Sequence, residues 1–204
     1  GVYERGLASP MPAPYEMTLG LVAFGEIGRE VAVRAKPFGF SLVAYDPFVA
    51  PEVATRYGVT LVALDALLER SDIVSVHAPL TKQTFHLLGA REFGLMKRTA
   101  YIVNTARGAV IDQEALIAAL QSRTIAGAGL DVFEREPLEA DSPLVGMENV
   151  ILTPHTAGMS DSSQIAVRRR TARNIAAALV GRWPETRDLV NPQVKSHPRQ
   201  RPAG

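Results

Sequence analysis

The chain has 204 residues, of which 47% are apolar and 21% are charged; this length and composition allow a sizeable core and exclude disorder as the main state. Its formal net charge of +1 provides no field that would select nucleic acid or an anionic membrane, and the absence of cysteine excludes a disulfide and a cysteine metal site. No window approaches the roughly 18 successive apolar residues of a membrane span, and no signal-peptide pattern opens the chain. We therefore expect a soluble protein, with the cytoplasm as the default location. We also expect no metal site.

Short apolar segments alternate with helical patterns from Thr18 onward. The apolar segments lack polar alternation, which is typical of parallel strands covered on both faces. We therefore expect a doubly wound α/β domain with a Rossmann-like parallel sheet. The expected strands are residues 18–24, 41–45, 72–78, 100–105, 125–133 and 149–154, and the expected helices are residues 27–38, 64–71, 90–96 and 112–121.

The two ends of the chain differ in pattern from this domain. A further helix is expected over residues 160–180, because Gly181 and Pro184 are typical of a helix end. We interpret its basic run, Arg168–Arg170, as a solvated helix face rather than a nucleic-acid contact. The expected divisions are an irregular arm or connecting segment over 1–17, the α/β domain over 18–158, the helical segment over 159–190 and a disordered tail over 191–204.

Residues 21–28, LVAFGEIG, have the pattern of a glycine turn that binds a dinucleotide. Gly25 would let a pyrophosphate approach the backbone, and Gly28 would let the following helix pack against the strand. Ala23 replaces the first glycine and loses easy access to positive φ, so we expect the turn to form in a region allowed to alanine. The two glycines also fit a plain strand-to-helix turn, so the surrounding sequence has to decide.

The residues around this turn favour a cofactor. The backbone N–H groups of Glu26 and Ile27 would face phosphates at the helix N-terminus, although the charge of Glu26 should reduce affinity. Asp46 ends the next strand, 18 residues after Gly28, near the spacing of the carboxylate that binds the ribose diol. Because a carboxylate there repels a 2′-phosphate, we predict NAD rather than NADP. The alternative is that Asp46 only initiates a turn with the proline after it.

Three polar residues each follow an apolar strand by a few positions: Arg107, Glu136 and His155. Ligands gather at the carboxyl ends of such strands, so we expect the three side chains at one rim. An arginine fork can bind the carboxylate of a 2-oxo or 2-hydroxy acid, a histidine can move the hydroxyl proton, and a neighbouring carboxylate can stabilise the imidazolium. Taken singly, each residue also fits an ordinary surface turn, loop charge or capped loop residue.

Several motifs together resemble the D-isomer-specific 2-hydroxyacid dehydrogenase family. They occur in order between Thr18 and Pro192 and read FGEIG, AYDP, HAPLTKQT, LMKRTAYIVNTARGAVID, AGAGLDVFEREPL and VILTPHTAG. The resemblance implies an NAD-dependent oxidoreductase that interconverts a small-molecule 2-oxo acid and a D-2-hydroxy acid. It further implies that residues 18–158 are the NAD-binding domain and that the protein is a homodimer.

The resemblance also implies roles for individual residues. Arg107 looks like the family's arginine that binds the substrate carboxylate and polarises the carbonyl, His155 like its acid/base, and Glu136 like the partner of that histidine. The residues expected to contact the cofactor are Gly25, Glu26, Ile27, Gly28, Asp46, His77, Ala78, Pro79, Thr84, Thr105, Ala106, Arg107, Asp131, His155, Ala157 and Gly158.

Family members carry a longer segment before the cofactor domain, which forms most of a substrate domain. Only the short arm precedes Thr18 here, so we expect the chain to be a fragment or part of a longer protein, with residues 159–190 returning toward the missing domain. Two alternatives stay open: an NAD(H)-responsive binding module, similar to the family's corepressor relatives, and a truncated fragment that binds NAD without turnover. The sequence does not identify which 2-hydroxy acid is the substrate.

Overall fold

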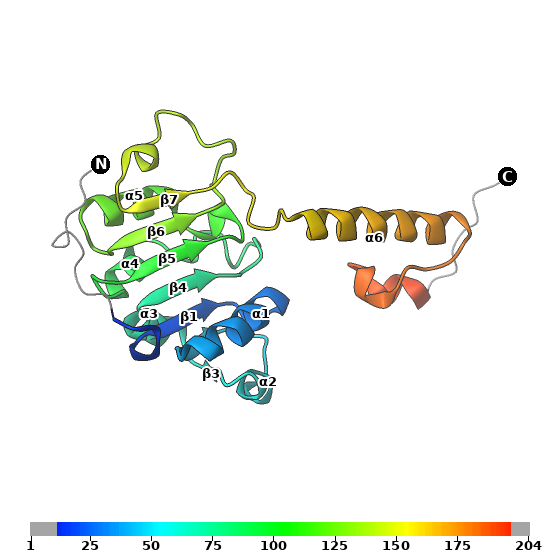
Figure 1. Ribbon diagram of the computed structural model, residues 1–204, viewed down its shortest axis with the longest axis horizontal. Coiled ribbons are helices and arrows are strands. Elements are labelled where there is room, and N and C mark those ends of the chain that lie inside the picture. Colours follow the sequence, from blue (N-terminus) through cyan, green and yellow to red (C-terminus); the bar gives the residue numbers. More distant parts are fainter. Residues whose placement is uncertain (1–11, 197–204) are drawn as a thin grey trace. The chain divides into compact units, whose positions relative to one another are not determined.

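The computed structural model describes residues 12–196, and the chain divides into two units, residues 1–157 and residues 158–204. The first unit is built on a seven-stranded sheet in the order β3-β2-β1-β4-β5-β6-β7 (Figure 1). Every strand pair is parallel, which confirms the predicted doubly wound α/β sheet. The strands are β1 Thr18–Val22, β2 Ser41–Tyr45, β3 Thr60–Leu61, β4 Ile73–Val76, β5 Tyr101–Asn104, β6 Gly127–Leu130 and β7 Val150–Leu152.

Helices connect the strands and cover the sheet. They are α1 Glu26–Ala35, α2 Pro51–Arg56, α3 Leu64–Arg70, α4 Ala90–Leu95 and α5 Gln113–Gln121, with the 3-10 helices η2 Pro14–Glu16, η3 Lys36–Phe38, η4 Gly108–Val110 and η5 Pro143–Gly146. Neither β3 nor α2 is among the predicted elements. At two and six residues, both are too short to show a sequence period of their own.

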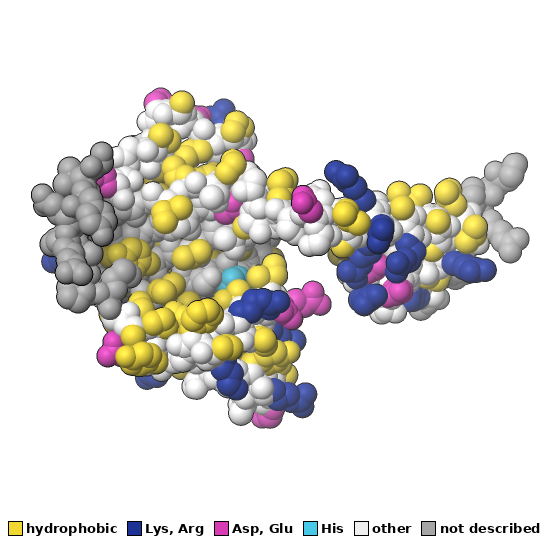
Figure 2. Space-filling model, viewed as in Figure 1, with side chains coloured by type: hydrophobic (Ala, Val, Ile, Leu, Met, Phe, Trp, Pro, Cys, Tyr) yellow, Lys and Arg dark blue, Asp and Glu magenta, His cyan; other side chains and the backbone are white. Residues whose placement is uncertain are grey.

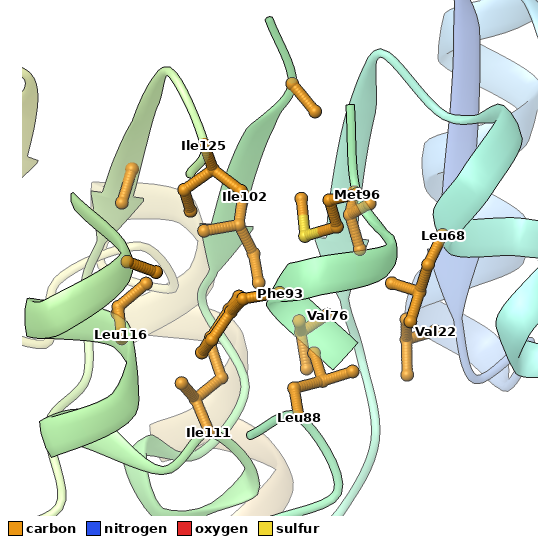
Figure 3. Close-up of a cluster of buried hydrophobic side chains, with 14 of the residues drawn as sticks. Val22, Leu68, Val76, Leu88, Phe93, Met96, Ile102, Ile111, Leu116 and Ile125 are labelled. Atoms are coloured by element: carbon orange, nitrogen blue, oxygen red, sulfur yellow. The ribbon is translucent and has the colours of Figure 1, made fainter. Parts of the chain in front are cut away.

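The strands bury both faces, so the first unit has two clusters of buried side chains. On β2, Val43 belongs to one cluster, while its neighbours Leu42 and Ala44 belong to the other, because successive side chains of a strand point to opposite faces. The larger cluster includes Leu68 of α3 and Phe93 of α4 (Figure 3). With both faces covered, the carboxyl edge of the sheet, where the strands end in loops, is left to form a binding site.

The second unit is a long helix followed by short turns. Helix α6, Asp161–Leu179, begins after Ser160, whose hydroxyl accepts a hydrogen bond from Ser163 N, and none of its residues is buried. The 3-10 helix η6, Thr186–Asp188, follows. Lys and Arg side chains gather over this unit (Figure 2). In the predicted basic run, Arg170 forms an ion pair with Asp188.

A short 3-10 helix lies in the segment that the sequence predicts to be a tail. Pro192–Ser196 form the 3-10 helix η7, and the hydrogen bond from Val194 N to Asn191 O closes this turn. Residues 197–204 of the predicted tail, and residues 1–11 of the predicted arm, lie outside the described residues. Within residues 12–196, no helix combines the length and the apolar character needed to cross a bilayer.

Candidate functional site

The turn after β1 takes the conformation of a glycine turn although Ala23 replaces the glycine. Ala23 has a φ of 73°, so the expectation that alanine would avoid this conformation is wrong. Hydrogen bonds fix the turn on both sides of the residue: Ala23 N donates to Tyr45 O at 2.8 Å, and Phe24 N donates to Asp46 Oδ2 at 2.9 Å. These two bonds offset a left-handed conformation that costs an L-residue roughly 1–2 kcal/mol.

The two remaining glycines of the turn, Gly25 and Gly28, have different surroundings. A Cβ on Gly28 would lie 2.7 Å from Ala23 O, so only glycine lets α1 approach the strand this closely. A Cβ on Gly25 would meet nothing within 4 Å, which leaves open space beside the N-terminus of α1. Gly25 is the N-cap and provides no side-chain cap, so the first N–H groups of α1, including those of Glu26 and Ile27, have no partner within the helix. This geometry fits a pyrophosphate.

A groove of about 490 Å³ continues from this turn. Of the predicted cofactor residues, it is lined by Gly25, Asp46, His77, Ala78, Pro79 and Thr84. The Asp46 carboxylate is already a structural acceptor, because its Oδ1 accepts from Phe48 N at 2.9 Å while its Oδ2 accepts from the glycine turn. Each carboxylate oxygen can accept more than one hydrogen bond, so Asp46 can hold the turn and still accept from a ribose hydroxyl.

His77 contributes an uncharged wall to this groove. Burial lowers the pKa of His77 to about 4, so the imidazole is neutral at physiological pH. Its buried Nε2 has no hydrogen-bond partner among the described residues. On the same segment, Thr84 Oγ1 donates to Pro79 O at 2.6 Å and closes the loop that borders the groove.

Glu136 and His155, predicted as a pair, are in direct contact. Their Oε2 and Nδ1 atoms lie 2.7 Å apart, and both residues line a cavity of about 620 Å³ whose other lining residues are mostly apolar. The hydrogen bond with His155, followed by one from Phe133 N to the other carboxylate oxygen, lowers the pKa of Glu136. The pair therefore holds a carboxylate against one ring nitrogen and leaves His155 Nε2 as the second nitrogen for a ligand.

Asp131 organises the loop that carries His155. It is 3% exposed, and its carboxylate accepts from Thr153 Oγ1 at 2.5 Å, Thr156 N at 2.8 Å and Ala157 N at 2.9 Å. Burial acts to raise the pKa of Asp131, but these hydrogen bonds outweigh burial and lower it. The backbone of Asp131 also accepts from His155 N at 2.8 Å. His155 is thereby held at a φ of 55°, a conformation uncommon outside glycine.

Arg107 extends from a turn that is held by Asn104, the last residue of β5. Asn104 is 1% exposed; its side chain accepts from Ala106 N and donates to Arg107 O, both at 3.0 Å. The Arg107 guanidinium donates to Ala106 O at 2.6 Å and is exposed. Among the described contacts it reaches neither Glu136 nor His155, so the three side chains share an edge of the sheet without forming one bonded cluster.

The remaining predicted residues are assigned as follows. Thr105 and Ala106 belong to the turn held by Asn104, and Ala157 ends the loop held by Asp131, while Gly158 belongs to the second unit. The residues that the predictions lack are Asn104 and Thr153, both of which hold the site in place. Their sequence signal is a polar residue that closes or follows an apolar strand.

Comparisons with known proteins identify the family to which this fold belongs. The family model described as "D-isomer specific 2-hydroxyacid dehydrogenase, NAD binding domain" matches residues 4–157. Glyoxylate reductase from Korarchaeum cryptofilum is 47% identical over 180 residues, which cover 88% of this chain and 54% of that protein. D-3-phosphoglycerate dehydrogenase from Methanocaldococcus jannaschii is 43% identical over 178 residues, which cover 87% of this chain and 33% of that protein.

A solved structure gives the same result. The crystal structure of D-lactate dehydrogenase with NAD+ from Lactobacillus jensenii is similar with a TM-score of 0.80 and 34% identity, covering 90% of this chain and 58% of that chain. The chain thus spans about half the length of the glyoxylate reductases and of this lactate dehydrogenase. The chain belongs to the D-isomer specific 2-hydroxyacid dehydrogenase family, and residues 4–157 are an NAD binding domain of that family.

Proposed function

We propose that this chain provides the NAD-binding and acid–base parts of a dehydrogenase that interconverts a 2-oxo acid and a D-2-hydroxy acid. The observation that carries the proposal is the 2.7 Å contact between Glu136 and His155 at the carboxyl edge of an NAD-binding sheet. Relatives named glyoxylate reductase, D-3-phosphoglycerate dehydrogenase and D-lactate dehydrogenase support the substrate class. The substrate is therefore a small carboxylic acid with an oxygen on the neighbouring carbon.

The chain's own residues would hold the cofactor by backbone and carboxylate contacts. Gly25 leaves room for the pyrophosphate, and the first N–H groups of α1 would donate to it. Asp46 would accept from the ribose hydroxyls, which also disfavours a 2′-phosphate and hence NADP. When bound, NAD supplies the hydride acceptor or NADH the hydride donor.

The acid–base chemistry would run through His155 Nε2. In the reductive direction, the imidazolium donates the Nε2 proton to the substrate's carbonyl oxygen as that oxygen gains negative charge. Glu136 keeps Nδ1 protonated and fixes the ring orientation, as a carboxylate beside a catalytic histidine does. Arg107 would bind the substrate carboxylate as a fork and polarise the carbonyl. In the oxidative direction, the neutral imidazole accepts the hydroxyl proton.

The apolar walls of the cavity beside this pair would exclude water from the proton transfer. Phe133, Leu138 and Leu152 contribute to these walls, and a dry site strengthens each electrostatic contact within it. A homodimer remains a prediction that follows from the family resemblance, and a cytoplasmic location remains the default prediction from the sequence.

Two measurements on the 204-residue chain test the proposal. Calorimetry with NAD and with NADP reports cofactor binding, and we expect NAD to bind more tightly. A panel of glyoxylate, hydroxypyruvate and pyruvate with NADH then reports turnover as a loss of NADH absorbance. Hydroxypyruvate and pyruvate gain a stereocentre on reduction, and we expect their products in the D configuration. NAD binding without turnover on any 2-oxo acid would favour the alternative of a cofactor-binding module. Failure to bind NAD would contradict the assignment of the groove.

A further inference from the structure

His86 lies where three segments of the candidate site meet. Its backbone N donates to Ala109 O at 2.9 Å, and the next residues continue this pairing: Leu88 N donates to Val110 O at 3.2 Å, and Asp112 N donates to Leu88 O at 2.9 Å. The segment that ends at His86 borders the cofactor groove through Thr84. The segment paired with it begins at the Arg107 turn. These hydrogen bonds join the groove to that turn.

The third segment is the loop after β6, which carries Glu136. Its residue Glu134 exchanges two hydrogen bonds with the first residue of α5: Gln113 N donates to Glu134 Oε1 at 2.9 Å, and Glu134 N donates to Gln113 Oε1 at 3.3 Å. The loop also packs closely on Gly108, where a Cβ would lie 1.9 Å from Phe133 C. The loop that carries Glu136 therefore lies directly against the residue that follows Arg107.

The His86 imidazole lies between this loop and the start of α5. Its Nε2 lies 2.8 Å from Glu134 Oε1, and its Nδ1 lies 3.8 Å from Asp112 Oδ2. Nε2 is buried and has no hydrogen-bond partner among the described residues, so these contacts are electrostatic contacts without hydrogen-bond geometry. These two carboxylates are the charged groups that face His86 among the described residues. The ring stacks on Phe85 with centroids 3.9 Å apart, and the backbone of His86 has a φ of 50°. Non-glycine residues keep such a conformation where the surrounding structure fixes it, often at functional sites.

The arrangement of His86, Asp112 and Glu134 fits a link between two carboxylates better than a metal-binding site. Together with His86, the two carboxylates form a group whose ligand atoms lie within 4.8 Å of one another. A metal ion needs its ligands to converge on one point. Here the two ring nitrogens, which point in different directions, face different carboxylates. The ring instead lies between the two carboxylates and faces each of them with a different nitrogen.

We propose that His86 is a positioning residue for the acid–base pair: by bridging Asp112 and Glu134, it fixes the loop that carries Glu136 against the segment that carries Arg107. The inference rests on the proposed function, because the position of Glu136 affects catalysis only if Glu136 and His155 form the acid–base pair. Glu136 Oε1 accepts from Phe133 N at 3.1 Å within the same loop, so a displacement of the loop carries Glu136 with it. Release of the bridge should then lengthen the contact between Glu136 and His155.

The test uses the pKa of Glu136, read from the carboxyl carbon by NMR titration of the 204-residue chain. Contact with His155 holds this pKa below the usual range. We expect it to rise toward the ordinary glutamate value in H86Q and in E134Q. The E134Q variant decides between mechanisms, because loss of a nearby negative charge would by itself lower the pKa of Glu136. It also keeps an oxygen that can accept from Gln113 N.

The matched control is D65N, which breaks the exposed ion pair between Asp65 and Arg91 elsewhere in the first unit. This variant should leave the pKa of Glu136 unchanged. A preserved amide spectrum would show that each variant is folded, and if H86Q does not fold, E134Q carries the test. In an active preparation, H86Q should lower kcat severalfold and leave the Kd for NAD unchanged.

Three results would overturn an assignment, and they are distinguishable. An unchanged or lowered pKa of Glu136 in E134Q would overturn the positioning role and leave the proposed function intact. An ordinary pKa of Glu136 in the unsubstituted chain would instead contradict the acid–base pair itself. Saturable perturbation of the His86 resonances by Zn²⁺ alone, absent from E134Q, would replace the bridge with a metal site.

Discussion

The turn after β1 and the loops after β5, β6 and β7 lie at the same edge of one sheet, but they hold their functional groups differently. The turn after β1, here called the cofactor turn, presents backbone groups: an open position at Gly25, a close approach at Gly28 and an uncapped helix. One carboxylate, that of Asp46, holds this turn through Phe24 N. The loops after β5, β6 and β7, here called the acid–base loops, depend on two buried polar side chains. Asn104 and Asp131 form hydrogen bonds with the backbone of these loops. Changes of surface charge should therefore have small effects on the cofactor turn. Replacement of a single oxygen by a nitrogen in Asp131 should have a large effect on the acid–base loops.

The largest expected effect separates chemistry from cofactor binding. His155→Ala removes the group that we propose moves the proton, so turnover of a 2-oxo acid should fall on the order of a hundredfold or more. The Kd for NAD should stay nearly unchanged, because the cofactor turn is held without His155. Steady-state kinetics and calorimetry on the same preparation measure the two quantities. A large loss of NAD affinity would show that His155 supports the structure of the cofactor site. The cofactor turn and the acid–base loops would then not be independent of each other.

The next effect concerns stability and its pH dependence. Asp131→Asn replaces an acceptor-only group that receives three hydrogen bonds, so the free energy of unfolding at neutral pH should fall by about 2–3 kcal/mol. The folded-state pKa of Asp131 is lowered. Its stabilisation is therefore complete above the unfolded-state pKa and is lost as pH falls through the folded-state pKa.

Urea unfolding of both proteins across this pH range measures the difference. The stability gap between the unsubstituted chain and Asp131→Asn should narrow on acidification. If this difference in the free energy of unfolding stays constant with pH, the negative charge of Asp131 contributes nothing to stability beyond the shape of the side chain.

The sequence was informative where a property depends on local pattern. The strand periodicity predicts the parallel sheet that the structure has, and the motifs predict the family and the cofactor that the comparisons support. The roles of Arg107, Glu136 and His155 stay predictions. The sequence could not predict that Asp131 holds the loop of His155, because its side-chain hydrogen bonds join residues 22 to 26 positions apart. Asn104 binds residues only two and three positions away, so a polar residue at the end of an apolar strand was a usable signal there.

The same limit explains the error at Ala23. Intrinsic preference argues against a positive φ for alanine. The conformation is imposed by Tyr45 and Asp46, which lie in and after the next strand and accept hydrogen bonds from the turn. Such an override depends on tertiary contacts that a local reading does not contain.

A third, smaller effect follows from this conformation. Ala23→Gly should relieve the left-handed strain and raise the free energy of unfolding by about 0.5–1 kcal/mol, net of the added entropy of the unfolded chain. The control is Ala118→Gly in the middle of α5, at an exposed helical position. It should lower the free energy of unfolding by about 1 kcal/mol. Equal signs for the two variants would contradict the assigned strain.

The smallest expected effect tests whether the cofactor turn binds phosphate through its backbone. Glu26 is exposed in the first turn of α1, so its charge opposes a bound pyrophosphate without blocking the N–H groups. Glu26→Gln should tighten NAD binding about two- to fivefold at low ionic strength, the size of one solvent-screened charge interaction. Added salt should reduce this gain.

The matched control for this variant is Glu30→Gln, one turn further along α1, where the carboxylate pairs with Arg34. It changes the net charge by the same amount but lies away from the N–H groups, so the Kd for NAD should hardly change. Calorimetric titration of both variants at two salt concentrations measures the difference. If both substitutions tighten binding equally, the effect comes from the overall charge of the domain, and the N-terminus of α1 is not where the pyrophosphate binds.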